Sequence, residues 1–305
     1  MVNVKPKFLY LRVIAITAIV FFIFKRIEHD WEKIKNFSMH IDFMWLALSF
    51  IGLFLAYLFY AIVWTKMSNK FQDRLTLPQG IKIWFFSQPA KYVPGKGFIL
   101  VSRALLAKKY GIDNETTFAC GIVEFTAQAL GGFLMVFASM PFIAVFSNFF
   151  NGLKWLFVFA LLGFVVIHPK IFSFLINKLL KVLKRKQISL NMTYADMAGY
   201  MASYASIHFM AGISFYIFAR AFYPVPLNFI FLFATAFTAS YFIGLFSFLT
   251  PAGLGVREGL LLVFLNNVLP PGIIVQIVLL SRLWTVGLEL LVSGIIFAMD
   301  KICEG

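Results

Sequence analysis

Long apolar runs alternate with short polar segments along the whole chain of 305 residues. A mostly apolar run of about 20 residues is long enough to span the hydrocarbon core of a bilayer as an α-helix. The runs of this kind, the fourth shorter than the rest, are 8–24, 43–64, 118–146, 154–167, 194–218, 227–249 and 273–299. The pattern therefore predicts an all-α polytopic membrane protein with about 6–8 transmembrane helices.

Two further apolar segments are broken by proline and glycine. The breaks are Pro94-Gly95-Lys96-Gly97 and Pro251-Ala252-Gly253-Leu254-Gly255. Neither proline nor glycine continues a stable helix. Broken backbone at membrane depth is tolerated only where protein or a water-filled cavity satisfies its N–H and C=O groups. We expect two re-entrant segments here; the alternatives are full crossings or, at the second break, a short polar loop at the membrane surface.

The two broken segments lie at corresponding places in two halves of the chain. Glu124 follows Pro94 by 30 positions and Arg282 follows Pro251 by 31, each in a later long span. Paired breaks of this kind point to a transporter site at the interface of an inverted repeat. Proline and glycine are common in membrane helices generally, so coincidence is the alternative.

Composition supports the same class of protein. Hydrophobic residues make up 61% and charged residues 13%, whereas a soluble domain averages about 45–50% and about 25%. We therefore expect one integral membrane domain over residues 1–305. The net charge of +14 comes from basic residues that flank apolar runs, where they indicate orientation and contact with anionic lipid headgroups. A nucleic-acid partner is not expected.

The chain divides into a first half (1–168), a basic connector (169–193) and a second half (194–305). The basic loop after the 43–64 run indicates that this loop and the N-terminus are cytoplasmic. Apolar residues of the connector can share one helical face, which predicts an amphipathic helix on the cytoplasmic membrane surface.

Ionisable side chains occur inside the spans themselves. At helical spacing Glu124 and Gln128 share one face, and so do Arg282 and Glu289 on the last span. Such residues face the interior of a bundle or a cavity rather than lipid. They could instead neutralise buried partners and fix the helix packing. Together with residues of the broken segments, the candidates for binding a substrate are Lys91, Lys96, Arg103, Glu124, Gln128, Arg257, Glu258, Arg282 and Glu289.

The chemistry of this set suits a phosphate group. Helix ends created by the breaks present free N–H groups and positive dipole ends, and the arginines and lysines add charge. The glutamates would balance these cations when the site is empty, or engage a cationic headgroup. The sequence contains no Gly-x-x-x-x-Gly-Lys-Ser/Thr, His-Glu-x-x-His or Gly-x-Ser-x-Gly pattern. We therefore expect no ATP-driven step, no metal site, no cofactor and no nucleophile elbow.

At these residues the chain resembles the transmembrane region of lysylphosphatidylglycerol synthase, also called the flippase-like domain family. The matching pieces are Lys91-Tyr92-Val93-Pro94-Gly95-Lys96-Gly97, Arg103, Glu124, Arg282 and, most specific, the Pro-x-Gly-x-Gly-x-x-Glu pattern that ends at Glu258. The resemblance implies re-entrant helices, a location in the plasma (inner) membrane, and movement of lipids with modified headgroups between leaflets. Full-length synthases add a soluble aminoacyl-transferase domain that this chain does not show, so aminoacylation of lipid is not expected.

Residues and resemblance together predict a lipid flippase. Its cargo would be a phosphate-bearing lipid with an anionic or modified headgroup, such as an aminoacyl phospholipid, a glycolipid or a polyprenyl-phosphate-linked sugar. One alternative is an integral membrane transferase that uses Glu124 or Glu258 as a base on a lipid-linked substrate. The other is a membrane scaffold for envelope-synthesis enzymes, which would then be its partners.

Overall fold

The computed structural model describes residues 41–92, 97–142, 168–182, 187, 192–246, 253 and 255–304. The predicted spans 8–24 and 154–167 lie outside the described residues. So do Pro94 and Pro251, although the helices on either side of both breaks are described.

The described part of the chain is helical, as the hydrophobic pattern predicts. Five of its helices are long and apolar enough to cross a membrane. They are α3 (Phe43–Phe71), α6 (Asn114–Ser139), α10 (Tyr194–Arg220), α11 (Ile230–Phe246), whose apolar span Leu227–Gly244 includes the turn before it, and α13 (Pro271–Glu304). This confirms an all-α polytopic membrane protein.

Shorter helices fill the connections between the long ones. Five of those described belong to the first half: α4 (Leu77–Ser87), the 3₁₀ helix η1 (Gln88–Tyr92), α5 (Phe98–Ala107) and the 3₁₀ helices η2 (Lys108–Tyr110) and η3 (Met140–Phe142). The others are α9 (Pro169–Val182), η5 (Leu227–Phe229) and α12 (Val256–Leu265). The bounds place α4 and α5 on the two sides of the first break.

Helix ends follow local capping rules. Asp42 caps α3 by accepting hydrogen bonds from the backbone N–H groups of Met44 (2.9 Å) and Trp45 (3.3 Å). Thr193 and Asp196 form a reciprocal capping box at the start of α10, with a 2.8 Å bond from the Thr193 N–H to the Asp196 carboxylate. These side chains satisfy N–H groups that the first turn of a helix leaves without a partner.

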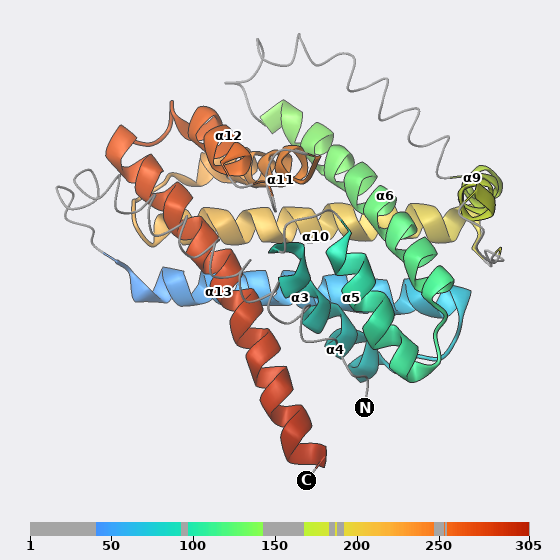
Figure 1. The fold of residues 1–305 in the computed structure, drawn as a ribbon. Coiled ribbons are helices and arrows are strands. Elements are labelled where there is room, and N and C mark those ends of the chain that lie inside the picture. The colour runs from blue at the N-terminus through green and yellow to red at the C-terminus, as the bar shows by residue number, and fades with distance from the viewer. Residues whose placement is uncertain are drawn as a thin grey trace.

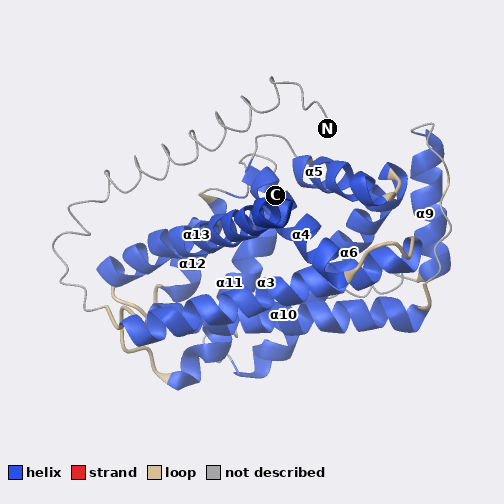
Figure 2. Ribbon diagram, turned by 90° about the horizontal axis from the view of Figure 1, so that it is seen from below, coloured by secondary structure: helices blue, strands red, loops and turns tan. Residues whose placement is uncertain are grey.

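The core is built around α10, which packs on α3, α6 and α11 (Figure 1). Small residues allow close approach. A Cβ added to Gly212 would meet the Ala234 Cα of α11 at 2.5 Å, and one added to Gly131 of α6 would meet the Met201 carbonyl at 2.7 Å. Small residues at such contacts let membrane helices pack backbone to backbone. Helix α13 runs obliquely across α3 and α10 (Figures 1 and 2).

The helices that follow the two breaks begin in the same way. Gly97 precedes α5 with φ of 104°, and Gly255 precedes α12 with φ of 83°. Both values lie in the left-handed region that favours glycine. With 10 residues each, α5 and α12 are about 15 Å long, roughly half the thickness of the hydrocarbon core. Re-entrant insertion suits helices of this length, and it stays a prediction.

Candidate functional site

Charged residues from both halves meet around Glu289 of α13, whose side chain is 1% exposed. Its Oε1 lies 2.5 Å from the Lys91 ammonium nitrogen, and its Oε2 accepts a 3.0 Å hydrogen bond from the Tyr92 hydroxyl. Lys91 and Tyr92 belong to η1, immediately before the first break. The carboxylate therefore ties the first broken segment to the last span.

The second break reaches the same region through Glu258 on α12. One carboxylate oxygen, Oε2, accepts a 2.6 Å hydrogen bond from the Gly255 N–H, which caps the helix. The other, Oε1, lies 3.6 Å from the Arg282 Nε, an ion-pair distance that is longer than a hydrogen bond. The Arg282 guanidinium lies 5.9 Å from the centre of the Tyr92 ring. We call Lys91, Tyr92, Arg257, Glu258, Arg282 and Glu289 the cross-half cluster.

Arg257 is the distinctive member of the cross-half cluster. The residue is 6% exposed, and its guanidinium carbon lies 4.6 Å from the centre of the Phe237 ring of α11. Within the described residues, its buried Nη2 has no hydrogen-bond acceptor. Buried polar groups in folded proteins almost always have a partner. A guanidinium with an open donor edge is therefore placed to receive an oxygen acceptor.

A second group of polar side chains lies within the first half. Arg103, 2% exposed, pairs with Glu124, donates through Nε to the Ser87 hydroxyl at 3.1 Å, and lies 4.9 Å from the Trp64 ring centre. The Gln128 amide donates to Glu124 at 3.1 Å. We call Ser87, Arg103, Glu124 and Gln128 the first-half cluster. The members of this cluster are hydrogen-bonded or ion-paired to one another. This agrees with the alternative that such residues neutralise buried partners and fix the helix packing.

The two clusters are neighbours in the structure. Tyr241 of α11 lies within electrostatic range of Glu289 and Arg257 of the cross-half cluster and also of Glu124 and Arg103 of the first-half cluster. In addition, the Ser293 hydroxyl of α13 donates to the Phe85 carbonyl of α4 at 3.1 Å. Most of the predicted site residues thus lie in one region, divided into two groups that the sequence does not distinguish.

The family of the chain follows from a comparison with known protein families. The family model described as the lysylphosphatidylglycerol synthase TM region matches residues 9–293. The chain belongs to this family. No curated protein matches the chain at a significant level. The match covers both halves and the connector, and it confirms the resemblance carried by the two broken motifs.

Family membership, together with the five long apolar helices, makes the chain an integral membrane protein. Among the described residues, no group of three or more His, Cys, Asp or Glu side chains could hold a metal ion. Lys96, a candidate from the first family motif, lies outside the described residues. Its role stays a prediction.

Sequence reasoning missed four contributors to the two clusters: Tyr92, Phe237, Ser87 and Trp64. Tyr92 stands inside the first family motif, directly after Lys91, and this position was the available signal. Phe237 is one of 39 phenylalanines, so nothing in the sequence singles it out as the ring beneath Arg257. The packing of the helices decides which aromatic or hydroxyl side chain lies against a given charged residue.

Proposed function

We propose that the chain moves a phosphate-bearing lipid between the two leaflets of its membrane, with the cross-half cluster as the headgroup site. The observation that carries this proposal is Arg257, whose buried guanidinium lies on Phe237 and keeps Nη2 without an acceptor in the described part of the chain. An arginine held by ring stacking presents a planar fork that matches two oxygens of a phosphate.

The charge balance of the cluster supports an anionic ligand. The Lys91 ammonium nitrogen lies 2.5 Å from the Glu289 carboxylate, and the Arg282 Nε lies 3.6 Å from that of Glu258. Arg257 adds a further cation beside these two pairs. An incoming phosphate would therefore complete the site electrostatically, while the acyl or prenyl tails stay in the bilayer.

The position of the cluster supports alternation between two openings. Its ion pair joins η1 of the first half to α13 of the second, and Glu258 belongs to the helix after the second break. A phosphate that competes with Glu289 for Lys91 would loosen the contact between the halves. Binding energy spent in this way shifts the population between two arrangements of the halves. The Lys91 side chain is 25% exposed, which gives the headgroup a point of entry.

In this proposal the lipid leaves with the covalent structure with which it entered. The carboxylates then act as counter-ions that exchange partners, rather than as bases. Mass spectrometry of lipid recovered from vesicles with the protein would show unchanged masses. A new lipid species that forms only with the protein would favour the transferase alternative.

Reconstituted vesicles provide the test. Headgroup-labelled aminoacyl phospholipid, glycolipid or polyprenyl-phosphate lipid is added, and a membrane-impermeant quencher reports how fast label changes leaflet. Arg257→Gln removes charge-assisted hydrogen bonds of about 1.5–3 kcal/mol, which corresponds to a loss of about 10–150-fold in headgroup affinity. The rate at subsaturating lipid should fall accordingly.

Arg220→Gln is the matched control. Arg220 lies at the end of α10 with its guanidinium 4.4 Å from the Trp45 ring centre, and it is not part of the cross-half cluster. This variant removes a ring-stacked arginine elsewhere and should keep the wild-type rate. If the wild-type protein leaves every lipid class at the rate of protein-free vesicles, the proposal is wrong.

A further inference from the structure

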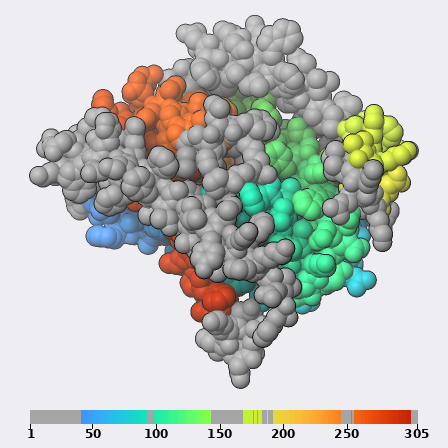
Figure 3. Space-filling model, viewed as in Figure 1, coloured from blue at the N-terminus to red at the C-terminus, as the bar shows by residue number. Residues whose placement is uncertain are grey.

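Helix α9 lies across the end of α10 rather than alongside the long helices, and two views show this arrangement (Figures 1 and 2). Its 14 residues make it about 21 Å long, too short to cross a bilayer. Phe172 and Leu180 are 4% and 7% exposed and belong to the hydrophobic core. One face of α9 is thus anchored to the helix bundle, and the rest is at the molecular surface (Figure 3).

A second face of α9 is apolar and exposed. Ile171, Phe174, Leu175 and Val182 are 40%, 65%, 44% and 73% exposed, and their spacing places them on one side of the helix. In an integral membrane protein, an apolar stripe on a helix that lies across the bundle end fits the border between headgroups and acyl chains. The Lys178 ammonium lies 6.0 Å from the Phe174 ring centre, so its stem extends along this stripe as in a snorkelling lysine.

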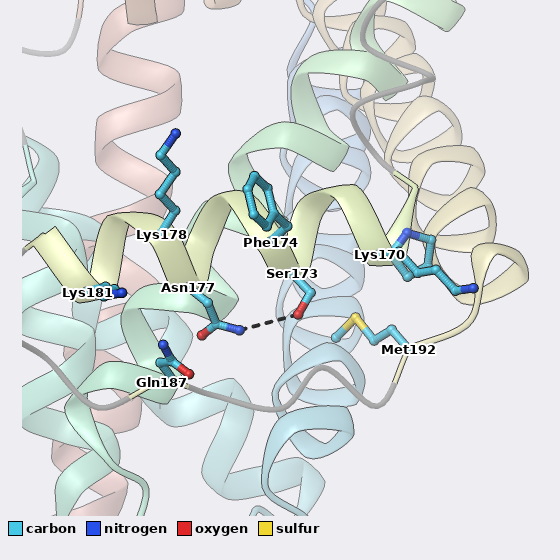
Figure 4. A pocket seen from close by; sticks show the side chains of 9 residues that line it. Lys170, Ser173, Phe174, Asn177, Lys178, Lys181, Gln187 and Met192 are labelled. Atoms are coloured by element: carbon cyan, nitrogen blue, oxygen red, sulfur yellow. Dashed lines mark hydrogen bonds between the residues drawn. The ribbon is translucent and has the colours of Figure 1, made fainter.

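Between the anchored face and the exposed stripe, α9 carries a polar face that opens on a hollow of about 800 Å³. The polar lining of the hollow includes Lys170, Ser173, Asn177, Lys181 and Gln187, and Met192 adds an apolar wall. Ser173 and Asn177 point toward Gln187 and Met192, while Phe174 and Lys178 extend from the other side (Figure 4). Lys170 and Lys181 stand toward the two ends of this face (Figure 4).

The hollow is complementary to a negative charge. Helix α9 reads PKIFSFLINKLLKV and contains no aspartate or glutamate. The Asn177 amide donates to the Ser173 hydroxyl at 3.4 Å, and the Ser173 hydroxyl and the Gln187 amide can in turn donate hydrogen bonds to phosphate oxygens. Lys170 and Lys181 are both exposed, so their ammonium groups can reach a headgroup.

We propose that this hollow binds the headgroup of one anionic phospholipid of the surrounding leaflet, whose acyl chains lie along the Ile171–Val182 stripe. The site is separate from the cross-half cluster and goes beyond transport. Because α9 belongs to the connector between the two halves, the bound lipid holds that connector at the membrane surface. Basic segments beside spans attract anionic lipids in this way.

A photo-cross-linking residue in place of Phe174 tests the proposal in the full chain. Phe174 is exposed and lines the hollow, so a benzophenone side chain fits there without disturbing the core. The protein is reconstituted into vesicles with equal amounts of phosphatidylglycerol and phosphatidylcholine of identical acyl chains. Mass spectrometry of the α9 peptide then counts each lipid adduct. We expect at least fivefold more phosphatidylglycerol than phosphatidylcholine adduct.

Two paired variants decide whether the lysines of α9 cause this preference. Lys170→Gln with Lys181→Gln should bring the adduct ratio close to one. Lys108→Gln with Lys109→Gln is the control. These lysines are exposed, and their helix η2 ends three residues before Asp113, whose carboxylate accepts a hydrogen bond from Gln72 at the end of α3 (3.0 Å). That end of α3 also carries the Lys70–Asp196 pair (3.0 Å) at the start of α10, so both pairs of lysines lie at one end of the bundle. The control should keep the preference.

Further outcomes define failure. Equal cross-linking of the two lipids in the wild-type background would overturn the proposal, and so would an equal loss of preference in the control. Soluble glycerol 3-phosphate supplies the headgroup chemistry without acyl chains. Its addition in millimolar excess should leave the adducts unchanged if an intact lipid is bound, and loss of the adducts would show a site for free phosphate esters. Cross-linking does not depend on transport, so it can succeed or fail independently of the proposed function.

Discussion

Lys91 and Glu289 are 198 positions apart in the chain, yet the Lys91 ammonium nitrogen lies 2.5 Å from a Glu289 carboxylate oxygen. This pair connects η1, at the edge of the first break, to the middle of α13. It is the most direct evidence that the two halves meet at charged residues. Arg282 and Glu258 bring the second break to the same place.

Removing one partner of this pair should destabilise the protein more than removing both. Lys91→Met leaves the buried Glu289 carboxylate without its paired ammonium group, although the hydroxyls of Tyr57 and Tyr92 still donate to it, and we expect a loss of about 3 kcal/mol. This is the low end for buried pairs because Lys91 is 25% exposed. Adding Glu289→Gln should recover part of the loss. Denaturation of the wild type, both single variants and the double variant in detergent measures the coupling energy between Lys91 and Glu289. Strictly additive losses of stability would contradict the prediction.

The stacking of Arg257 on Phe237 predicts that Phe237→Leu weakens lipid binding, whereas the same substitution at Phe233 does not. Phe237→Leu removes the ring face and with it a cation–π interaction of about 0.5–2 kcal/mol. The guanidinium then loses its fixed orientation, and the concentration of lipid for half-maximal transport should rise about 2–30-fold. Phe233→Leu, another buried α11 phenylalanine, is the control. An equal rise in both variants would show a packing effect instead.

The first-half cluster should matter for stability more than for transport. Arg103→Leu alone leaves Glu124 buried without its cation and should destabilise the protein by about 3–5 kcal/mol. Arg103→Leu with Glu124→Leu removes both charges and should be close to wild type in stability. If the cluster serves packing, this double variant still moves lipid at the wild-type rate. Loss of transport in a stable double variant would instead assign Glu124 to the headgroup site.

Much of this arrangement can be predicted from the sequence. Glu124 with Gln128 and Arg282 with Glu289 share helix faces as their spacing predicts, and most of their surface is buried. The helices extend beyond the predicted apolar runs at their polar ends: α3 continues to Phe71 and α6 begins at Asn114. Hydropathy marks where a helix crosses hydrocarbon, whereas hydrogen bonding and capping decide where it ends.

The division of the charges into two clusters could not be predicted. Spacing places Glu124 and Glu289 on inward faces, and the first broken segment supplies Lys91 and Arg103, but neither pattern says which cation meets which carboxylate. That choice depends on the packing of α5 against α6 and of α4 against α13. Arg257 illustrates the same limit, because its burial and its ring partner Phe237 result from the contact of α11 with α12.

Two glycines of α10 give a matched test of how closely α10 and α11 pack against each other. A Cβ at Gly212 would meet the Ala234 Cα at 2.5 Å and Cβ at 2.7 Å, so backbone would have to shift. Gly212→Ala should therefore destabilise the protein by about 1–3 kcal/mol.

A Cβ at Gly199 meets nothing within 4 Å, and alanine there is favoured over glycine in a helix by about 1 kcal/mol. Gly199→Ala should be neutral or stabilising in the same thermal unfolding assay. The difference between the two variants isolates the contact of α10 with α11, since both place the same side chain in the same helix. A Gly212→Ala protein as stable as Gly199→Ala would mean that these helices lie farther apart in the membrane.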